Sequence, residues 1–291
     1  MRARPARARP LSLTFFVFIA LAGGAAGCAR AATGSATAAS QLGAVPAHDT
    51  FTVQSRALGE PRLINVYVPL QSRATALKAA TPLPVLYMPD GGVDEDFLHV
   101  VHTVDSLISR GAIRPVLVVG VPNTQRRRDL TGPTRIAADS AIGPRIGGSA
   151  AFRQFIREEL IPEVERRYMT TTERAIVGES LAGLFIVETF LTEPALFTHY
   201  IALDPSVWWN AGLLVDSAMS RITAMGDAPR TLYLATSVEP SSAVGTARLA
   251  ALLRATPPRG LRWTYTPRPD LTHGTIFRAL EAASLADALR Q

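Results

Sequence analysis

One serine in this chain stands where a serine can act as a nucleophile. Residues 174–191 read "RAIVGESLAGLFIVETFL", an apolar run that bends at Gly178 and resumes as a helical pattern directly after Ser180. A sharp strand–turn–helix exposes a serine hydroxyl at the edge of a sheet, and it needs small neighbours because the backbone comes close. Gly178 and Ala182 meet that need in a G-x-S-x-A pattern. The competing interpretation is a plain helix N-cap serine.

A serine hydroxyl is a weak nucleophile, so the same site needs a general base. His273, in "PDLTHGTIF", is the one histidine that follows the last predicted strand. In serine hydrolases of this architecture the chain order is serine, acid, histidine, and His273 is therefore the predicted base. We expect ordinary surface or structural roles for the other four histidines: His48, His99, His102 and His199.

Three carboxylates compete for the role of the acid that orients this histidine. In this architecture the acid follows the strand after next, and Glu239 stands at that position, directly after "RTLYLATSV". Asp270 lies three residues before His273 and suits a local loop contact. Asp204 ends the run "HYIALDP" and is interpreted as capping the turn that follows. Chain order favours Glu239, with Asp270 as its competitor.

The oxyanion of an acyl-transfer reaction needs two N–H donors. The N–H of Leu181, one residue after the serine and at a helix N-terminus, is the expected first donor. The second is expected in the "DGG" that follows "PVLYMP", from Gly92 or Gly91, since glycine leaves the backbone N–H open to a substrate. The competing interpretation is a simple turn. The adjacent acidic residues 94–96 fit the start of a helix better than a metal site, and we expect no metal and no cofactor.

The elements that must position these groups alternate along the chain. Residues 51–55 and 62–69 alternate apolar and polar side chains, as expected for two antiparallel strands at a sheet edge. Six short apolar runs follow, separated by helical patterns, which predicts a mostly parallel sheet with helices on both faces in one domain. These runs are residues 84–90, 115–122, 174–179, 199–205, 230–236 and 261–267.

The N-terminal residues predict export. Residues 1–31 combine the basic "MRARPARARP" with the apolar "LSLTFFVFIALAGG", which is short for a membrane span. Cleavage before Cys28 would give a lipoprotein attached to the membrane through that cysteine, and cleavage after residues 29–31 ("ARA") would give ordinary secretion. We expect a periplasmic or membrane-anchored protein, with a flexible tether over residues 32–48 and the folded domain over residues 49–291.

The charge of the chain excludes one class of partner. The formal net charge is +6, but the first 31 residues hold five arginines and no acidic residue, so the remainder has 25 basic against 24 acidic side chains. A nearly neutral domain has no electrostatic footprint for a nucleic acid. The expected partner is a small-molecule ester.

At this level the chain resembles the putative-esterase family of α/β-hydrolases, which includes esterase D, enterochelin-type siderophore esterases, carbohydrate esterases and mycolyltransferases. The resemblance covers about residues 50–290 and rests on the serine segment together with "VLYMPDGG", "PVLVVGVPNTQRRRDLTGPT", "FRQFIREELIPEVERRY", "FTHYIALDPSVWWN" and "THGTIF". It implies an α/β-hydrolase fold with Ser180 as nucleophile, His273 as base and Glu239 in the region of the usual acid, although some siderophore esterases work with a Ser–His pair alone. Glu179 departs from the histidine that commonly precedes the serine.

Two features bear on the substrate. Arg126 and Arg128, in the long loop 123–148, could bind an anionic or catechol-bearing acyl group, or could belong to a solvated charge run. Trp208 or Trp209 is expected to form a pocket wall, with Trp208 as the candidate for a substrate contact, and the other to pack in the core. The predicted activity is hydrolysis of a carboxylic ester through an acyl-enzyme. The alternatives are acyl transfer to an alcohol and a non-catalytic binding protein on the same fold.

Overall fold

The computed structural model describes residues 45–69, 72 and 81–290. The predicted export signal, Cys28 and most of the predicted tether lie outside these residues. Residues 45–48 of the tether are described, and the ring of His48 meets the ring of Phe97 edge-on at 5.4 Å. In the part of the chain that is described, no helix is long and apolar enough to span a membrane.

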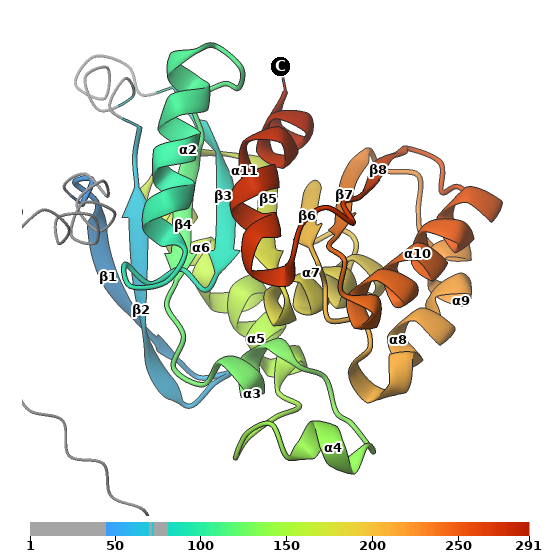
Figure 1. The fold of residues 1–291 in the computed structure, drawn as a ribbon. Coiled ribbons are helices and arrows are strands. Elements are labelled where there is room, and N and C mark those ends of the chain that lie inside the picture. The colour runs from blue at the N-terminus through green and yellow to red at the C-terminus, as the bar shows by residue number, and fades with distance from the viewer. Residues whose placement is uncertain (1–44, 70–71, 73–80, 291) are drawn as a thin grey trace, which may run out of the picture. The chain divides into compact units, whose positions relative to one another are not determined.

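Eight strands form one sheet in the order β1-β2-β4-β3-β5-β6-β7-β8 (Figure 1). The strands β4, β3, β5, β6, β7 and β8 are mutually parallel, and the β1–β2 hairpin joins β4 in the antiparallel sense. The predicted mostly parallel sheet with an antiparallel edge is thus confirmed. The strands are β1 Asp49–Ser55, β2 Glu60–Tyr67, β3 Leu83–Pro89, β4 Leu117–Val121, β5 Thr170–Glu179, β6 His199–Leu203, β7 Arg230–Thr236 and β8 Leu261–Pro267.

Helices cover both faces of the sheet. One face carries α2 and α11, and the other carries the continuous α5–η1–α6 helix together with α7, α9 and α10. The helices are α2 Phe97–Ser109, α3 Arg126–Leu130, α4 Ala137–Ser140, α5 Ser149–Phe155, η1 Ile156–Leu160, α6 Ile161–Arg167, α7 Leu181–Thr192, η2 Trp209–Gly212, α8 Leu213–Asp216, α9 Ala218–Thr223, α10 Pro240–Ala255 and α11 His273–Leu289.

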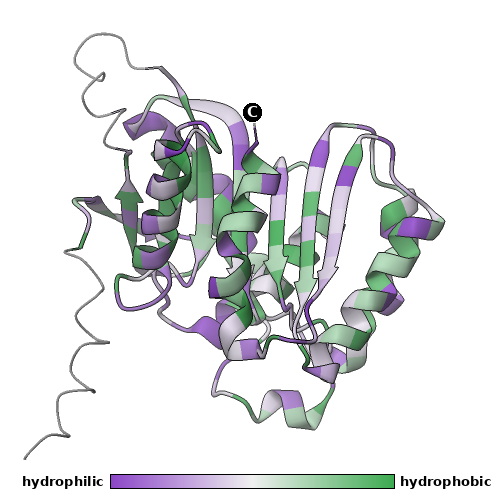
Figure 2. Cartoon of the chain, turned by 45° about the horizontal axis from the view of Figure 1, so that its top comes forward, coloured by the Kyte–Doolittle hydropathy of each residue, from purple (hydrophilic) through white to green (hydrophobic). Residues whose placement is uncertain are grey.

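Successive side chains of the central strands point to opposite faces and fill both cores. On β5, Ile176 belongs to the core under α7, whereas Ala175 and Val177 belong to the core under α2 and α11. Strands buried on both faces need apolar residues at consecutive positions, which is the pattern that the sequence shows. Figure 2 shows the corresponding hydrophobic colour along the strands and hydrophilic residues on the outer sides of the helices.

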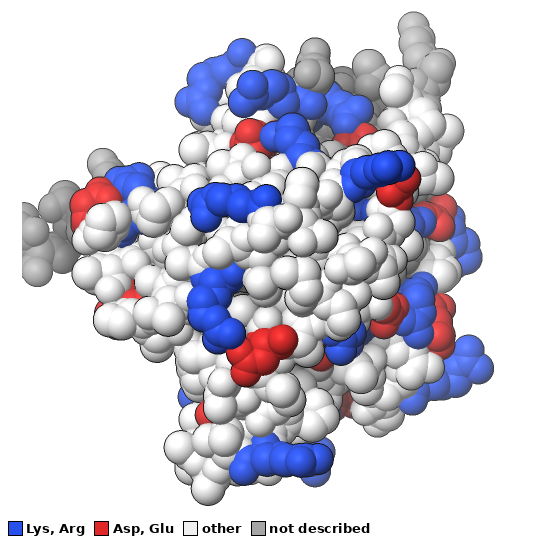
Figure 3. Space-filling view, turned by 90° about the vertical axis from the view of Figure 1, so that its right-hand side faces the viewer, with Lys and Arg blue, Asp and Glu red and all other residues white. Residues whose placement is uncertain are grey.

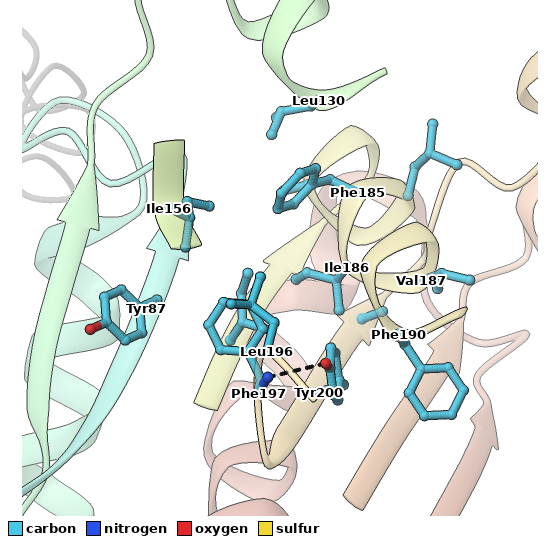
Figure 4. Packing of buried hydrophobic residues seen from close by; sticks show 14 of the residues in the cluster. Tyr87, Leu130, Ile156, Phe185, Ile186, Val187, Phe190, Leu196, Phe197 and Tyr200 are labelled. Atoms are coloured by element: carbon cyan, nitrogen blue, oxygen red, sulfur yellow. Dashed lines mark hydrogen bonds between the residues drawn. The ribbon is translucent and has the colours of Figure 1, made fainter. Parts of the chain in front are cut away.

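The helix α7 is apolar around most of its circumference because it lies between the sheet and other helices. Phe185, Ile186 and Phe190 are fully buried in the core that Figure 4 shows from close by. The hydroxyl of Tyr200 in the same core accepts a hydrogen bond from the N–H of Phe197 at 3.2 Å. This packing holds α7 rigidly beneath the end of β5, which is where Ser180 lies.

Candidate active site

Ser180 occupies the sharp bend between β5 and α7. Its backbone has φ 60° and ψ −120°, a conformation that side-chain-bearing residues rarely adopt. A Cβ on Gly178 would lie 2.6 Å from the Cβ of Ala182, and one on Gly183 would lie 3.0 Å from the Cα of Pro205. Ser180 is at the N-cap position of α7, but its side chain makes no capping hydrogen bond. The geometry therefore favours the nucleophile interpretation over the capping one, and it explains the small residues around the serine.

His273 is held by Asp204, not by Glu239. Its Nδ1–H donates to Asp204 Oδ2 at 2.7 Å. Glu239 is exposed at the residue before α10, and Asp270 is exposed and bound by Arg268. The prediction that Glu239 orients the histidine is therefore wrong, and so is the alternative prediction that Asp270 does. The expectation that the acid follows the strand after next missed Asp204, which directly follows β6, the very next strand after the serine.

The surroundings of Asp204 stabilise a negative charge on its carboxylate next to the imidazole of His273. Its side chain is fully buried, and it accepts hydrogen bonds from the Ser237 N–H at 2.9 Å and the Ser237 hydroxyl at 2.7 Å. Burial alone would raise the pKa of Asp204, but the hydrogen bonds from His273 and Ser237 outweigh it and hold that pKa below its usual range. The same contact with Asp204 raises the pKa of His273. An ionised carboxylate thus fixes the imidazole and stabilises its protonated form.

Backbone hydrogen bonds tie the serine to the residues beside this carboxylate. The Ser180 N–H donates to Leu203 O at 3.1 Å, and the Ser206 N–H donates to Ser180 O at 3.0 Å. Among the described residues, the hydrogen bond of Ser180 Oγ is a long one of 3.5 Å to Ser206 Oγ, and none joins it to His273. In enzymes without substrate the nucleophile–base bond is often long and tightens when substrate binds. The backbone bonds to Leu203 and Ser206 thus hold Ser180 next to Asp204, the residue that binds His273.

The helix α11 carries the base, and a buried histidine anchors that helix. His99 of α2 is buried and hydrogen bonds to Asp96 at 2.9 Å and to Glu281 of α11 at 2.8 Å. Burial lowers the pKa of His99, but the bonds to the two carboxylates outweigh it and raise that pKa. At the other end of α11, Thr272 and Thr275 form a capping box just before and after His273. His99 thus has a structural role, as predicted.

The loop after β3 holds both glycines that were predicted as oxyanion donors, and both N–H groups have partners. The Gly91 N–H donates to Val121 O at 3.1 Å, so Gly91 is committed to the sheet edge and the prediction for it is wrong. The Gly92 N–H donates to the Glu95 carboxylate at 2.8 Å, which an incoming oxyanion would have to displace. Leu181 is the first residue of α7, where backbone N–H groups have no acceptor within the helix. Its role as a donor stays a prediction.

The two arginines predicted to bind substrate are ion-paired within the protein. Arg126 makes a bidentate pair with Asp90, at 2.7 and 2.8 Å, beside the glycine loop. Arg128 binds both oxygens of Glu60 and one oxygen of Asp129. Neither guanidinium is an unpaired cation, although each keeps N–H groups that these pairs do not use. Their contact with substrate stays a prediction.

Both tryptophans contact the core under α7, and one of them also lines a cavity. Trp209 lines a cavity of about 260 Å³ next to Leu184 and Glu188, and its indole N–H donates to Gly132 O at 2.8 Å. Trp208 is partly buried against the core under α7. The sequence favoured Trp208 for a substrate contact, whereas the cavity wall in the structure comes from Trp209.

Basic and acidic side chains are scattered over the face shown in Figure 3, with uncharged areas between them. A single-sign stripe of the kind that tracks a nucleic acid is not present on that face. The described residues contain no group of three or more His, Cys, Asp or Glu side chains that could hold a metal ion. The chemistry available at the site is that of the serine, the histidine and the carboxylates around them.

Comparison with known proteins agrees with this geometry. The family model Esterase, described as "Putative esterase", matches residues 55–247. The chain belongs to this esterase family. The match covers β2 through the first half of α10 and therefore includes the serine bend, the glycine loop and Asp204.

Several proteins that are similar to this chain are siderophore esterases. The ferri-bacillibactin esterase BesA of Bacillus subtilis strain 168 is 30% identical over 180 residues, which are 57% of this chain and 61% of BesA. The apo-salmochelin esterase of Escherichia coli O6:H1 is 26% identical over 72% of this chain and 70% of that protein. The structure of an IroE-like serine hydrolase from Shewanella oneidensis superposes with a TM-score of 0.73 at 26% identity, over 84% of this chain and 79% of that one. This chain aligns with less than two thirds of BesA.

Proposed function

We propose that this protein is an exported serine esterase that hydrolyses a small-molecule ester of the siderophore class through an acyl-enzyme. The observation that carries the proposal is the strained, partly exposed Ser180 beside the Asp204–His273 pair. Membership of the esterase family and the siderophore esterases among its relatives support ester hydrolysis.

The geometry suggests a role for each group in the reaction. His273 carries a proton on Nδ1, which faces Asp204, so Nε2 is free to take the proton of the Ser180 hydroxyl as that oxygen attacks the ester carbon. The imidazolium that forms is stabilised by the buried carboxylate and then protonates the leaving alcohol. Water attacks the acyl-enzyme by the same route, and Ser180 is regenerated. The N–H of Leu181 is the first oxyanion donor, and Gly92 supplies the second once Glu95 moves away.

The experiment compares purified mature wild type with Ser180→Ala. Wild type should hydrolyse a short p-nitrophenyl ester and be labelled by a fluorophosphonate, and Ser180→Ala should lose both because the attacking oxygen is gone. Labelling of both proteins to the same extent would remove Ser180 from the mechanism. Wild type that binds an ester without cleaving it would instead indicate a non-catalytic binding protein. Addition of an acceptor alcohol separates hydrolysis from acyl transfer, since a transferase would release the ester of that alcohol.

Export rests on the sequence of residues 1–31. The test is fractionation of cells that produce the full chain and its Cys28→Ala variant. A lipoprotein should partition with membranes as wild type and move to the soluble exported fraction as Cys28→Ala. Equal partition of both would argue for ordinary secretion, and retention of both in the cytoplasm would overturn export.

A further inference from the structure

Glu179, immediately before the nucleophile, has a carboxylate without a hydrogen-bond partner. It is the last residue of β5 and pairs with Leu203, the neighbour of Asp204, across the sheet. Its Oε1 is shielded from solvent and finds no donor among the described residues. A buried polar group left without a partner destabilises the folded protein. Glu179 as a whole is only partly buried, so a small rotation of its carboxyl presents an oxygen to a donor that arrives with the substrate.

The surroundings of Glu179 define what that partner must be. Charged groups that interact with it are His273, Asp204, Asp96 and Arg126. The arginine is already paired with Asp90, and Asp96 is already bound to His99. Among the described residues the Glu179 carboxyl has no hydrogen-bond partner, and acidic groups around it outnumber uncommitted basic ones. Such a place accepts a hydrogen-bond donor and rejects an anion.

We propose that Glu179 is a specificity-determining residue that accepts a hydrogen bond from an N–H group of the substrate beside the scissile ester. The charge of Glu179 acts on His273, the proposed base, so its carboxyl lies close to the carbonyl that Ser180 attacks. This inference rests on the proposed esterase function and adds the substrate feature that the site selects. An amine and a secondary amide both supply such an N–H.

Burial raises the pKa of Glu179 to about 7. A carboxyl in either protonation state keeps an oxygen that can accept a hydrogen bond, so selection does not depend on its ionisation. Ionised Glu179 also raises the pKa of His273 by its charge. A purely electrostatic role of that kind would change kcat/KM for every ester by the same factor. A role in specificity would change the ratio of kcat/KM between two matched esters.

The test uses two pairs of p-nitrophenyl esters that differ at one group beside the carbonyl. The alanine and isobutyrate esters exchange an amino group for a methyl, and the N-acetylalanine and O-acetyllactate esters exchange an amide N–H for an oxygen. The ratio of kcat/KM within each pair is measured for wild type, Glu179→Met and Glu179→Gln. Methionine keeps the volume and removes the acceptor, whereas glutamine keeps an acceptor oxygen. Glu239→Gln is the control, since it removes an exposed charge near the site.

We expect wild type to favour the N–H ester in at least one pair by about tenfold, as for a hydrogen bond to a buried acceptor. The pair with the larger ratio identifies amine or amide as the donor. Glu179→Met should bring that ratio close to one, Glu179→Gln should restore part of it, and Glu239→Gln should leave it as in wild type. Equal ratios in wild type and Glu179→Met for both pairs would overturn the inference. Failure of the esterase proposal would look different, because then no ester would be cleaved in a Ser180-dependent way.

Discussion

Replacement of Asp204 by asparagine tests the residue at which the structure differs most from the sequence-based prediction of the site. Asparagine has the same shape, and its oxygen can still accept from the Ser237 N–H. Its amide nitrogen would then face His273 Nδ1 and donate to it, which places the imidazole proton on Nε2. That tautomer cannot take the proton of Ser180. The replacement also removes the buried charge that stabilises the imidazolium.

The expected loss in kcat/KM is about 10³ to 10⁴, or about 4 to 5 kcal/mol of transition-state stabilisation, as for the corresponding change in other serine hydrolases. Glu239→Gln and Asp270→Asn are the matched controls, since both carboxylates are exposed and lack a bond to His273. Exposed charges contribute at most about 1 kcal/mol, so these variants should change kcat/KM by no more than about fivefold.

The assay is p-nitrophenyl ester hydrolysis as a function of pH, with circular dichroism to show that each variant is folded. Catalysis needs neutral His273, and Asp204 raises the pKa of that imidazole. The acid limb of the wild-type profile should therefore lie above pH 6.5, and in Asp204→Asn it should move to lower pH. A folded Asp204→Asn protein that keeps more than about a tenth of wild-type activity, with an unmoved acid limb, would refute this reasoning.

Three further predictions concern stability. Ser180 is strained at φ 60°, so Ser180→Gly should be about 1 kcal/mol more stable than Ser180→Ala in urea unfolding, and an equal stability would contradict the strain. Ionisation of Glu179 is disfavoured in the folded state, where its pKa is about 7 against 4.5 as a free side chain, so wild type should lose up to about 3 kcal/mol between pH 4.5 and 7. Glu179→Gln has no group that titrates at this position, so its free energy of unfolding should not show that loss. If the difference in unfolding free energy between wild type and Glu179→Gln is the same at pH 5 and pH 8, the raised pKa of Glu179 is contradicted. A Cβ on Gly91 would lie 2.2 Å from the Val121 nitrogen, whereas one on Gly226 meets nothing within 4 Å, so Gly91→Ala should cost more than about 2 kcal/mol and Gly226→Ala should cost little, as thermal unfolding of the pair would reveal.

The sequence alone determined the features that depend on local pattern. Six apolar runs specified the parallel strands β3 to β8, because a strand buried on both faces needs apolar residues at consecutive positions. Alternation of apolar and polar residues specified the edge strands β1 and β2. The small residues around Ser180 specified the bend, because only they fit between β5 and α7. His273 was identified by chain order, since it is the one histidine after the last strand.

Only the tertiary structure decided which distant groups meet. Asp204 lies near Ser180 because β6 is next to β5, and it meets His273 because α11, which begins at His273, packs against β6. The arginines near the site, the N–H groups of the glycine loop and the unpartnered Glu179 likewise depend on neighbours far away in the chain. Local sequence determines which residues can adopt a strand, a bend or a helix. The partner of a charged side chain depends on which strands lie side by side in the sheet. The order of the strands in the sheet cannot be deduced from the order of residues in the chain.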